Sequence, residues 1–153
     1  MIRDNVVVAC VEVILRDPQG RIMLAKRSRP PAEGIFWTVG GKRMPGESFG
    51  ETAARIVQRE AGLEIDPSRF QYFKTYSRAW ARRAEPPQYH GTHTDDSIMI
   101  LALTDEEKNA IELNSDDLSL PLWIFPKEII QRTPEFHSTV VEVIEDLLAH
   151  KGC

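Results

Sequence analysis

Apolar residues form separate runs along the chain, and their spacing distinguishes strands from helices. Residues 6–15 are almost continuously apolar and rich in β-branched side chains, which predicts a buried strand. A turn composition at residues 17–20 and a second apolar run at 21–27 predict the partner strand of a hairpin. Residues 70–80 and 97–103 predict two more strands, and residues 109–113 and 118–125 predict two strand-like segments.

Two stretches have the spacing of helices. The first covers residues 48–63 and stops at Gly62, and the second begins with Thr133 as N-cap and Pro134 as first helical residue. A helical turn is predicted between them, at residues 127–131. Strands flanking one central helix, with a second helix closing the chain, predict an α/β fold. The expected packing stripes are Phe49, Ala53, Ile56, Val57 and Ala61 in the first helix, and Phe136, Val140, Val143, Ile144, Leu147 and Leu148 in the second.

A glycine-framed loop leads into the first helix. Gly40 and Gly41 lack a Cβ, so they are expected to adopt positive φ and to point main-chain groups at a polar ligand. Pro45-Gly46 is a turn pair. The charged side of the helix is predicted to be a solvated face with a Glu51 to Arg55 pair, if composition alone is considered. That side carries Glu47, Glu51, Arg55, Arg59 and Glu60.

The order of residues in this unit favours a functional interpretation. It resembles the Nudix box, in which a glycine loop and a helix hold magnesium-binding carboxylates against a diphosphate. The resemblance implies the Nudix α/β/α sandwich with a mixed sheet. The matching residues are Gly41, Glu47 after five intervening residues, Arg55 after seven more, and then Glu60 and Gly62-Leu63.

Two acids of the box are replaced in this chain. Ile56 stands where the family usually has a Glu directly after the Arg, and Arg59 stands where it has the first of two adjacent Glu residues. Only Glu60 remains among the usual helix ligands. Magnesium keeps several waters and needs few protein oxygens. We therefore expect one Mg²⁺ ion, with Mn²⁺ as an alternative, and a box that has lost its activity is the competing interpretation.

One branch of the Nudix family, the GDP-mannose mannosyl hydrolases, is similar in lacking these two acids. Residues 25–42 resemble the stretch that leads into the box in that branch, and residues 136–138 resemble its segment before the last helix. The resemblance implies hydrolysis of a GDP-mannose-like nucleoside diphosphate sugar, with water attacking the sugar carbon and releasing GDP and sugar. Two alternatives stay open: a pyrophosphohydrolase that cleaves at phosphorus, and a non-catalytic module that binds nucleotide sugars.

The resemblance also implies roles for individual residues. Ser115 stands where the branch has a catalytic histidine, and a serine hydroxyl alone cannot take a proton from water at neutral pH. Asp116, Asp117 and His93 are candidate replacements. The implied metal ligands are the Gly40 carbonyl, Glu60 and Asn114, and the implied catalytic residues are Arg27 and Lys42 for charge on the diphosphate and Arg55 for orienting the acids. Among the candidate replacements for the histidine, Asp116 is our choice of catalytic residue.

Further residues are candidates for binding the substrate. An acid inside an apolar run, as at Glu12, more often faces solvent at a strand edge, although the resemblance implies a substrate-side role. Phe36 is expected to cover the core or to stack on a base. Residues 82–96 predict a long loop acting as a lid, which is favoured over a second metal site at His90, His93, Asp95 and Asp96. The substrate-binding candidates are Glu12, Arg27, Phe36, Arg78 and His93.

Composition limits the remaining function classes. At 153 residues, the chain is expected to form one domain over residues 1–153. A net charge of −4 argues against a nucleic-acid partner, and no apolar run is long enough to span a membrane. Cys10 and Cys153 form no disulfide or metal pattern, so a reducing cytoplasm is expected. The expected partner is a small nucleotide, and resemblance to proteins that are commonly dimers implies a homodimer.

Overall fold

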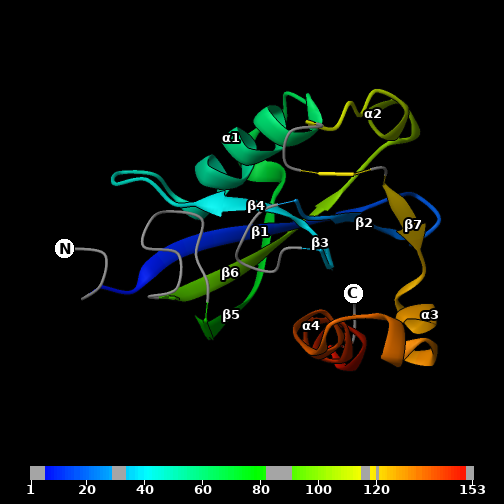
Figure 1. Ribbon diagram of the computed structural model, residues 1–153. Helices are drawn as coiled ribbons and strands as arrows, with labels where there is room; N and C mark the ends of the chain where they lie inside the picture. Colours follow the sequence, from blue (N-terminus) through cyan, green and yellow to red (C-terminus); the bar gives the residue numbers. More distant parts are fainter. Residues whose placement is uncertain (1–5, 29–33, 82–90, 115–117, 120, 151–153) are drawn as a thin grey trace.

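The fold is a mixed sheet between two helical layers. The computed structural model describes residues 6–28, 34–81, 91–114, 118–119 and 121–150. Helices α1 and α2 cover one face of the sheet, and α3 and α4 cover the other (Figure 1). This arrangement confirms the predicted α/β/α sandwich. The strands are β1 (Val8–Arg16), β2 (Ile22–Lys26), β3 (Phe36–Trp37), β4 (Val39–Lys42), β5 (Gln71–Trp80), β6 (Thr92–Ala102) and β7 (Leu122–Ile124), and the helices are α1 (Phe49–Ala61), α2 (Asp105–Asn109), α3 (Pro126–Gln131) and α4 (Ser138–Ala149), with 3-10 turns η2 (Pro67–Arg69) and η4 (Thr133–Glu135).

Strand β1 lies at the centre of the sheet. The strand order is β3-β2-β1-β6-β5, with β4 also paired to β1 and β7 to β2. The β1–β6 pair is parallel, and the other pairs are antiparallel. Because both faces of β1 are covered, its sequence is almost continuously apolar rather than alternating. This confirms the buried strand and the hairpin predicted at the start of the chain.

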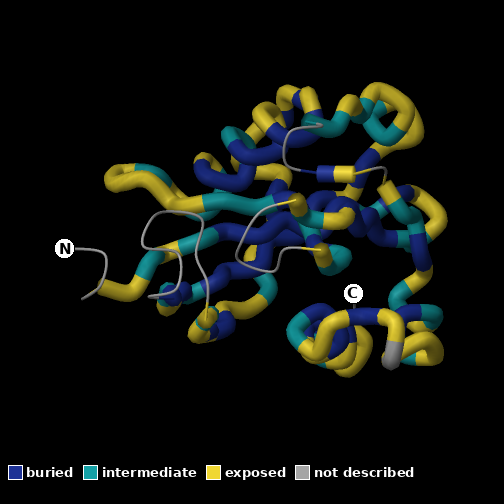
Figure 2. The backbone as a smooth tube through the Cα atoms, in the orientation of Figure 1, coloured by how far each residue is buried: buried dark blue, intermediate teal, exposed yellow. Residues whose placement is uncertain are grey.

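Two hydrophobic cores lie on opposite faces of the sheet. Figure 2 shows buried residues in dark blue along the central strands and in the helices on both sides of the sheet. Odd-numbered residues of β1 pack with α1, whereas Ile14 packs with α4. The packing stripe of α4 is confirmed except for Leu148, which is 43% exposed. None of the helices in the described part of the chain is long and apolar enough to cross a membrane.

Helix α1 has well-defined ends. Ser48 is the N-cap and forms a capping box with Glu51, and Gly62 ends the helix in the left-handed conformation at φ 70°. The helix predicted over residues 48–63 is confirmed. Arg55 forms its ion pair with Glu47 and not with Glu51, whose carboxylate accepts a hydrogen bond from the Ser48 N–H at 3.3 Å. The predicted Glu51 to Arg55 pair is wrong, since the capping box takes the Glu51 carboxylate.

Several predictions for the second half of the chain are wrong. Residues 105–109 form helix α2, with Thr104 and Glu107 as a capping box, a helix that was not predicted from the sequence. Strand β6 begins at Thr92, so residues 92–96 are not part of a loop. Among the described residues of the segment 118–125, Leu122–Ile124 form strand β7, and Leu118 makes an isolated bridge with Arg27. Residues 133–135 form η4, and α4 begins at Ser138 after the N-cap His137, because His137 Nδ1 accepts the Thr139 N–H at 3.3 Å.

Residues 109–113 do not form the predicted strand: Asn109 is the last residue of α2, and residues 110–113 lie at the end of α1. The Glu112 N–H donates to the Ala61 carbonyl at 3.0 Å, and the Asn114 N–H donates to the Glu60 carbonyl at 2.9 Å. The last carbonyls of a helix have no partner within the helix. This segment satisfies two of them, and it thereby brings Asn114 next to the end of α1.

Candidate active site

The loop and helix predicted to carry the chemistry are joined by an arginine–glutamate pair. Arg55 donates from Nε to Glu47 Oε2 at 2.8 Å and from Nη2 to Glu47 Oε1 at 2.9 Å. Its Nη2 also donates to the Lys42 carbonyl at 2.8 Å. The hydrogen bonds from Arg55, together with the Met44 N–H, lower the pKa of Glu47 to about 2. Arg55 therefore orients Glu47 and the loop, and in this structure it does not contact Glu60.

Gly40 and Gly41 lie in the extended strand β4, and neither has positive φ; the turn glycine Gly46, at φ 85°, does. The expectation of positive φ at Gly40 and Gly41 is wrong because both residues pair with β1. The two glycines are needed here because neighbouring side chains occupy the space that a Cβ would fill. A Cβ on Gly40 would overlap the Glu12 carboxylate, and a Cβ on Gly41 would lie 2.8 Å from Arg59 Nη2.

Glu60 is buried and only 4% exposed, which corrects its assignment to the solvated side of α1. Its Oε1 accepts a hydrogen bond from Arg59 Nε at 3.0 Å. Its Oε2 is also buried and has no hydrogen-bond partner in the described structure. A buried carboxylate oxygen without a partner is costly, so this atom is a candidate ligand for a cation.

The implied metal ligands lie close to one another. Arg59 Nη2 donates to the Gly40 carbonyl at 3.3 Å while its Nε holds Glu60, so one guanidinium reaches both residues. The Asn114 backbone is hydrogen-bonded to the Glu60 carbonyl. Carbonyl, carboxylate and amide oxygens suit Mg²⁺, which completes its octahedron with water. The donors therefore fit one divalent cation. The described residues contain no group of three or more His, Cys, Asp or Glu side chains able to hold a metal ion.

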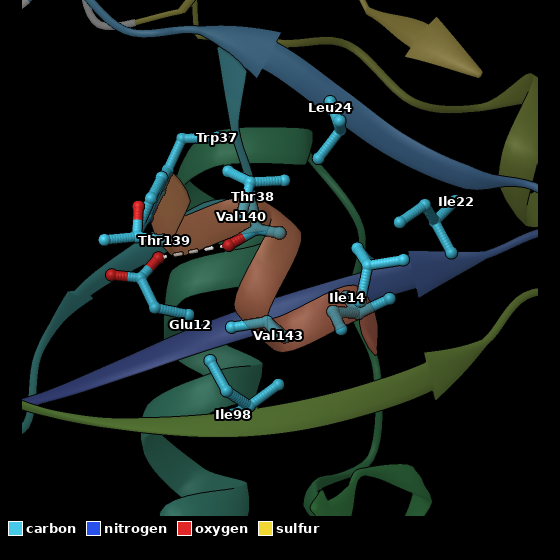
Figure 3. A pocket seen from close by; sticks show the side chains of 11 residues that line it. Glu12, Ile14, Ile22, Leu24, Trp37, Thr38, Ile98, Thr139, Val140 and Val143 are labelled. Carbon is cyan, nitrogen blue, oxygen red and sulfur yellow. Dashed lines mark hydrogen bonds between the residues drawn. The ribbon is translucent and has the colours of Figure 1, made fainter. Parts of the chain in front are cut away.

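Glu12 lies on the other face of the sheet, at the end of a small pocket between the sheet and α4 (Figure 3). It is 7% exposed, so the prediction of a solvent-facing strand edge is wrong. Burial and the negative charge of Asp96 raise the pKa of Glu12 to about 8, although the Arg27 charge and hydrogen bonds from Trp37 and Thr38 act in the opposite direction. Around neutral pH, Glu12 therefore holds a proton much of the time. The rest of the pocket is mainly apolar, with lining residues that include Ile14, Leu24, Ile98, Val140 and Val143.

Arg78 and Asp96 extend this polar group toward β5. Arg78 is 8% exposed, and its Nη1 lies 3.6 Å from Asp96 Oδ2, which is too long for a good hydrogen bond. Its Nη2 donates to the Thr139 carbonyl at 3.3 Å, whereas Nε and Nη1 have no hydrogen-bond partner in the described structure. Burial raises the pKa of Asp96, although Thr94 and Arg78 oppose that shift. Arg78 is therefore an incompletely bonded guanidinium beside one buried acid, Asp96, and one exposed acid, Glu142, whose Oε2 lies 3.7 Å from Nη2.

Asp96 is a site residue that the loop prediction obscured. It lies opposite Cys10 on β1 and Tyr76 on β5, in the middle of the sheet. The alternation of polar and apolar residues in β6 was the available signal, because residues two apart share one face of a strand. Asp96 therefore lies on the α4 face with Ile98, whereas His93 lies on the face that carries α1.

The remaining predicted residues lie at different places. Arg27 follows β2 and is close enough for its charge to lower the pKa of Glu12, and Lys42 lies opposite Cys10 in the sheet. Phe36 packs against the α4 core, with its ring centroid 6.0 Å from that of Phe136. His93 Nε2 lies 2.6 Å from Ser77 Oγ. Asp116, with Ser115, Asp117 and His90, lies outside the described residues, as do residues 82–90 of the predicted lid.

The sequence favours a lid over a second metal site at His90, His93, Asp95 and Asp96. His93 Nε2 and Asp95 Oδ1 are 4.0 Å apart on one face of β6, and Asp96 is on the other face. His93, Asp95 and Asp96 therefore cannot ligate one ion while β6 stays intact. For these three residues, a metal site is still the less favoured interpretation.

Comparison with known proteins identifies the class. The NUDIX domain family model matches residues 7–146, so the chain belongs to the NUDIX domain family. It is thus a member of the Nudix hydrolases, which generally use divalent metal ions, usually Mg²⁺. Among curated proteins, none matches the sequence at a significant level.

Solved structures agree on the fold at low sequence identity. The MutT NUDIX hydrolase of Burkholderia pseudomallei gives a TM-score of 0.71 at 16% identity, covering 93% of this chain and 98% of its own. The NUDIX domain of Shewanella oneidensis NrtR, complexed with ADP ribose, gives 0.67 at 14% identity, covering 95% and 88%. A C. elegans Ap4A hydrolase in a binary complex gives 0.61 at 16% identity, covering 94% and 96%.

Proposed function

We propose that this chain hydrolyses a nucleoside diphosphate sugar, of the GDP-mannose type, with water attacking the sugar carbon. The observation that carries the proposal is the buried Glu60 Oε2, which has no hydrogen-bond partner in the described structure and belongs to a carboxylate that shares one guanidinium with the Gly40 carbonyl. The ADP ribose bound to the NrtR domain is itself a nucleoside diphosphate joined to a sugar, which supports this substrate class.

The proposed cation site consists of the Gly40 carbonyl, Glu60 and Asn114. A bound Mg²⁺ would stabilise negative charge on the departing diphosphate. Arg27 and Lys42 add positive charge from the protein, and the planar guanidinium of Arg27 is suited to gripping two phosphate oxygens. Arg55 keeps Glu47 and the loop in place through the contacts described above. Asp116 is proposed as the base that takes a proton from water.

The proposed pocket for the rest of the substrate is the polar group around Glu12. Glu12 contacts the Cα side of Gly40 on the α4 face, while Arg59 contacts the carbonyl of the same residue from α1. A substrate whose diphosphate lies at the glycine loop would therefore have buried polar groups on both sides. Protonated Glu12 donates a hydrogen bond, whereas Arg78 Nε and Nη1 supply donors that have no hydrogen-bond partner in the described structure, although Nη1 lies 3.6 Å from Asp96 Oδ2. Sugar hydroxyls can accept such hydrogen bonds. Phe36 is proposed to contact the substrate at the edge of this region, and His93 is proposed to contact it from the α1 face of β6.

Isotope labelling separates this reaction from its alternatives. A panel of nucleotide sugars is incubated with the protein and Mg²⁺ in ¹⁸O-water, and the products are analysed by mass spectrometry. Label in the free sugar is the expected result. Label in a phosphate product would instead establish cleavage at phosphorus, and binding without turnover would establish a non-catalytic module.

A substitution tests the residue on which the proposal depends. Glu60→Gln removes the charge of a proposed cation ligand, so Mg²⁺-dependent turnover should fall by on the order of 100-fold. The matched control is Glu64→Gln, which changes an exposed glutamate just beyond the end of α1. Unchanged turnover in Glu60→Gln would remove Glu60 from the site.

A further inference from the structure

Arg59 lies between the two residues that are proposed to hold the cation. Its Nε donates to Glu60 Oε1 at 3.0 Å, and its Nη2 donates to the Gly40 carbonyl at 3.3 Å. Gly41 provides the space for this arrangement, because a Cβ there would lie 2.8 Å from Nη2. The guanidinium thus links α1 to β4, directly over the glycine loop.

A guanidinium in this position competes with a divalent cation. Magnesium binds its oxygen ligands at about 2.0–2.1 Å, which brings it much closer to them than a hydrogen-bonded nitrogen. A divalent ion at the Gly40 carbonyl would meet the like charge of Arg59 at short range. Arg59 must therefore move before these oxygens become metal ligands.

The contacts of Arg59 also show that it can move. Its side chain is 47% exposed, whereas that of Glu60 is 6% exposed. An ion pair open to solvent on one side is held weakly, because water screens and replaces its hydrogen bonds. The exposed part of the guanidinium can reach an anion in front of the loop. Arginine binds phosphate oxygens with two parallel hydrogen bonds, which suits it to a diphosphate.

We propose that Arg59 is a diphosphate-binding residue that makes cation binding depend on the substrate. In the free protein, its guanidinium occupies the Gly40 carbonyl and Glu60. A bound diphosphate draws the guanidinium to the phosphate oxygens and releases both ligands to the cation. The inference rests on the proposed function, which places the cation at these two residues.

The proposal predicts opposite changes in two affinities from one substitution. Arg59→Gln removes the competing charge, so Mn²⁺ alone, measured by isothermal titration calorimetry, should bind at least about tenfold more tightly than to the wild type, which is about 1.4 kcal/mol. The same variant loses a phosphate contact. Inorganic pyrophosphate, titrated in the presence of a chelator, should therefore bind several-fold more weakly.

Arg43→Gln is the matched control, because Arg43 belongs to the same loop but packs its guanidinium over the Phe49 ring, 4.4 Å from the centroid. It removes one positive charge and should leave Mn²⁺ affinity within about threefold of the wild type. Circular dichroism checks that each variant folds. If Arg59 had a merely structural role, Arg59→Gln would weaken the binding of both Mn²⁺ and pyrophosphate, or would change neither affinity. Either result overturns the proposal.

Glu60→Gln distinguishes the failure of this inference from failure of the proposed function. If Glu60→Gln weakens Mn²⁺ binding but Arg59→Gln does not strengthen it, only the role of Arg59 is overturned. If Glu60→Gln leaves Mn²⁺ binding unchanged, the cation site itself is misplaced, and both proposals fall.

Discussion

Glu12 and Glu60 are two buried glutamates on opposite faces of the sheet: Glu12 lies against Gly40, and Glu60 is linked to the same glycine through Arg59. Glu12 is 7% exposed and Glu60 is 4% exposed. Glu60 has an arginine as its hydrogen-bonded neighbour, whereas Glu12 faces a second acid, Asp96, and has Arg27 only as a longer-range charge. The two glutamates are therefore buried to a similar extent, but the nearest charged group is an arginine for Glu60 and an acid for Glu12.

The difference shows how one residue type can serve two purposes in a single site. A carboxylate held by a guanidinium can exchange that partner for a cation. A carboxyl group that is buried near another acid retains its proton, and so it donates a hydrogen bond instead of attracting cations. Gly40 allows both arrangements, since its missing side chain gives Glu12 room and its carbonyl faces Arg59.

The largest expected effect comes from removing the charge at Glu12. In the folded protein its pKa is about 8, compared with 4.5 for an ordinary glutamate. A raised carboxyl pKa means that the folded state binds more protons than the unfolded state between these values, so stability falls as pH rises from about 4.5 to about 8. At 1.36 kcal/mol per pKa unit, the ceiling of this loss is about 5 kcal/mol. Glu12→Gln should therefore be more stable than the wild type at pH 9, and the gain should disappear by pH 4.

Urea denaturation at several pH values measures this difference. The control is Glu64→Gln, because Glu64 is exposed. If the gain in Glu12→Gln did not depend on pH, Glu12 would titrate like an ordinary glutamate, and burial beside Asp96 would not control its charge.

The next largest effect tests the glycine between the two acids. Gly40→Ala places a Cβ on the Glu12 carboxylate, so we expect a loss of about 3 kcal/mol in the free energy of unfolding from overpacking. Gly41→Ala should cost less, because its Cβ meets the flexible end of Arg59. Combining Gly40→Ala with Glu12→Ala should recover part of the loss. Additive losses in the double variant would mean that Glu12 does not limit the space at Gly40.

The hydrophobic pattern was sufficient to predict most of the fold, because burial on one face or both faces leaves a period in the sequence. It predicted β1, β2, β5 and α1 with their approximate ends. It failed at residues 109–113, where the backbone bonds to the last carbonyls of α1. Such a contact between distant segments has no local signature, so the apolar residues in that segment were interpreted as a strand.

The candidate site was predictable only in part. Glu60 follows Val57 by three residues and Ile56 by four, which places it on the buried stripe of α1, but its charge led to its assignment to the outer face. Asp96 was hidden by the polar composition at the start of β6. The contacts of Arg59 with Gly40 and Glu60 depend on how α1 packs over β4, and spacing along the chain does not contain that information.

A smaller effect concerns the second acid on the α4 face. Asp96→Asn removes the like charge that helps to raise the pKa of Glu12, so that pKa should fall by roughly one unit. Carbon-13 NMR of the glutamate carboxyl group measures it directly. Asp95→Asn is the matched control, because Asp95 points to the opposite face of β6. An equal shift in both variants would show that general surface charge, and not the buried pair, sets the pKa of Glu12.

The smallest effect isolates one hydrogen bond to Glu12. Thr38 Oγ1 donates to Glu12 Oε2 at 3.2 Å, and Thr38→Val removes this donor with little change in shape. The expected cost is about 1 kcal/mol in unfolding free energy. Because a donated hydrogen bond favours the ionised carboxylate, the cost should be greater at pH 9 than at pH 5. In the Glu12→Gln background the same substitution should show no such pH dependence. If it still did, the titrating partner of Thr38 would be a group other than Glu12.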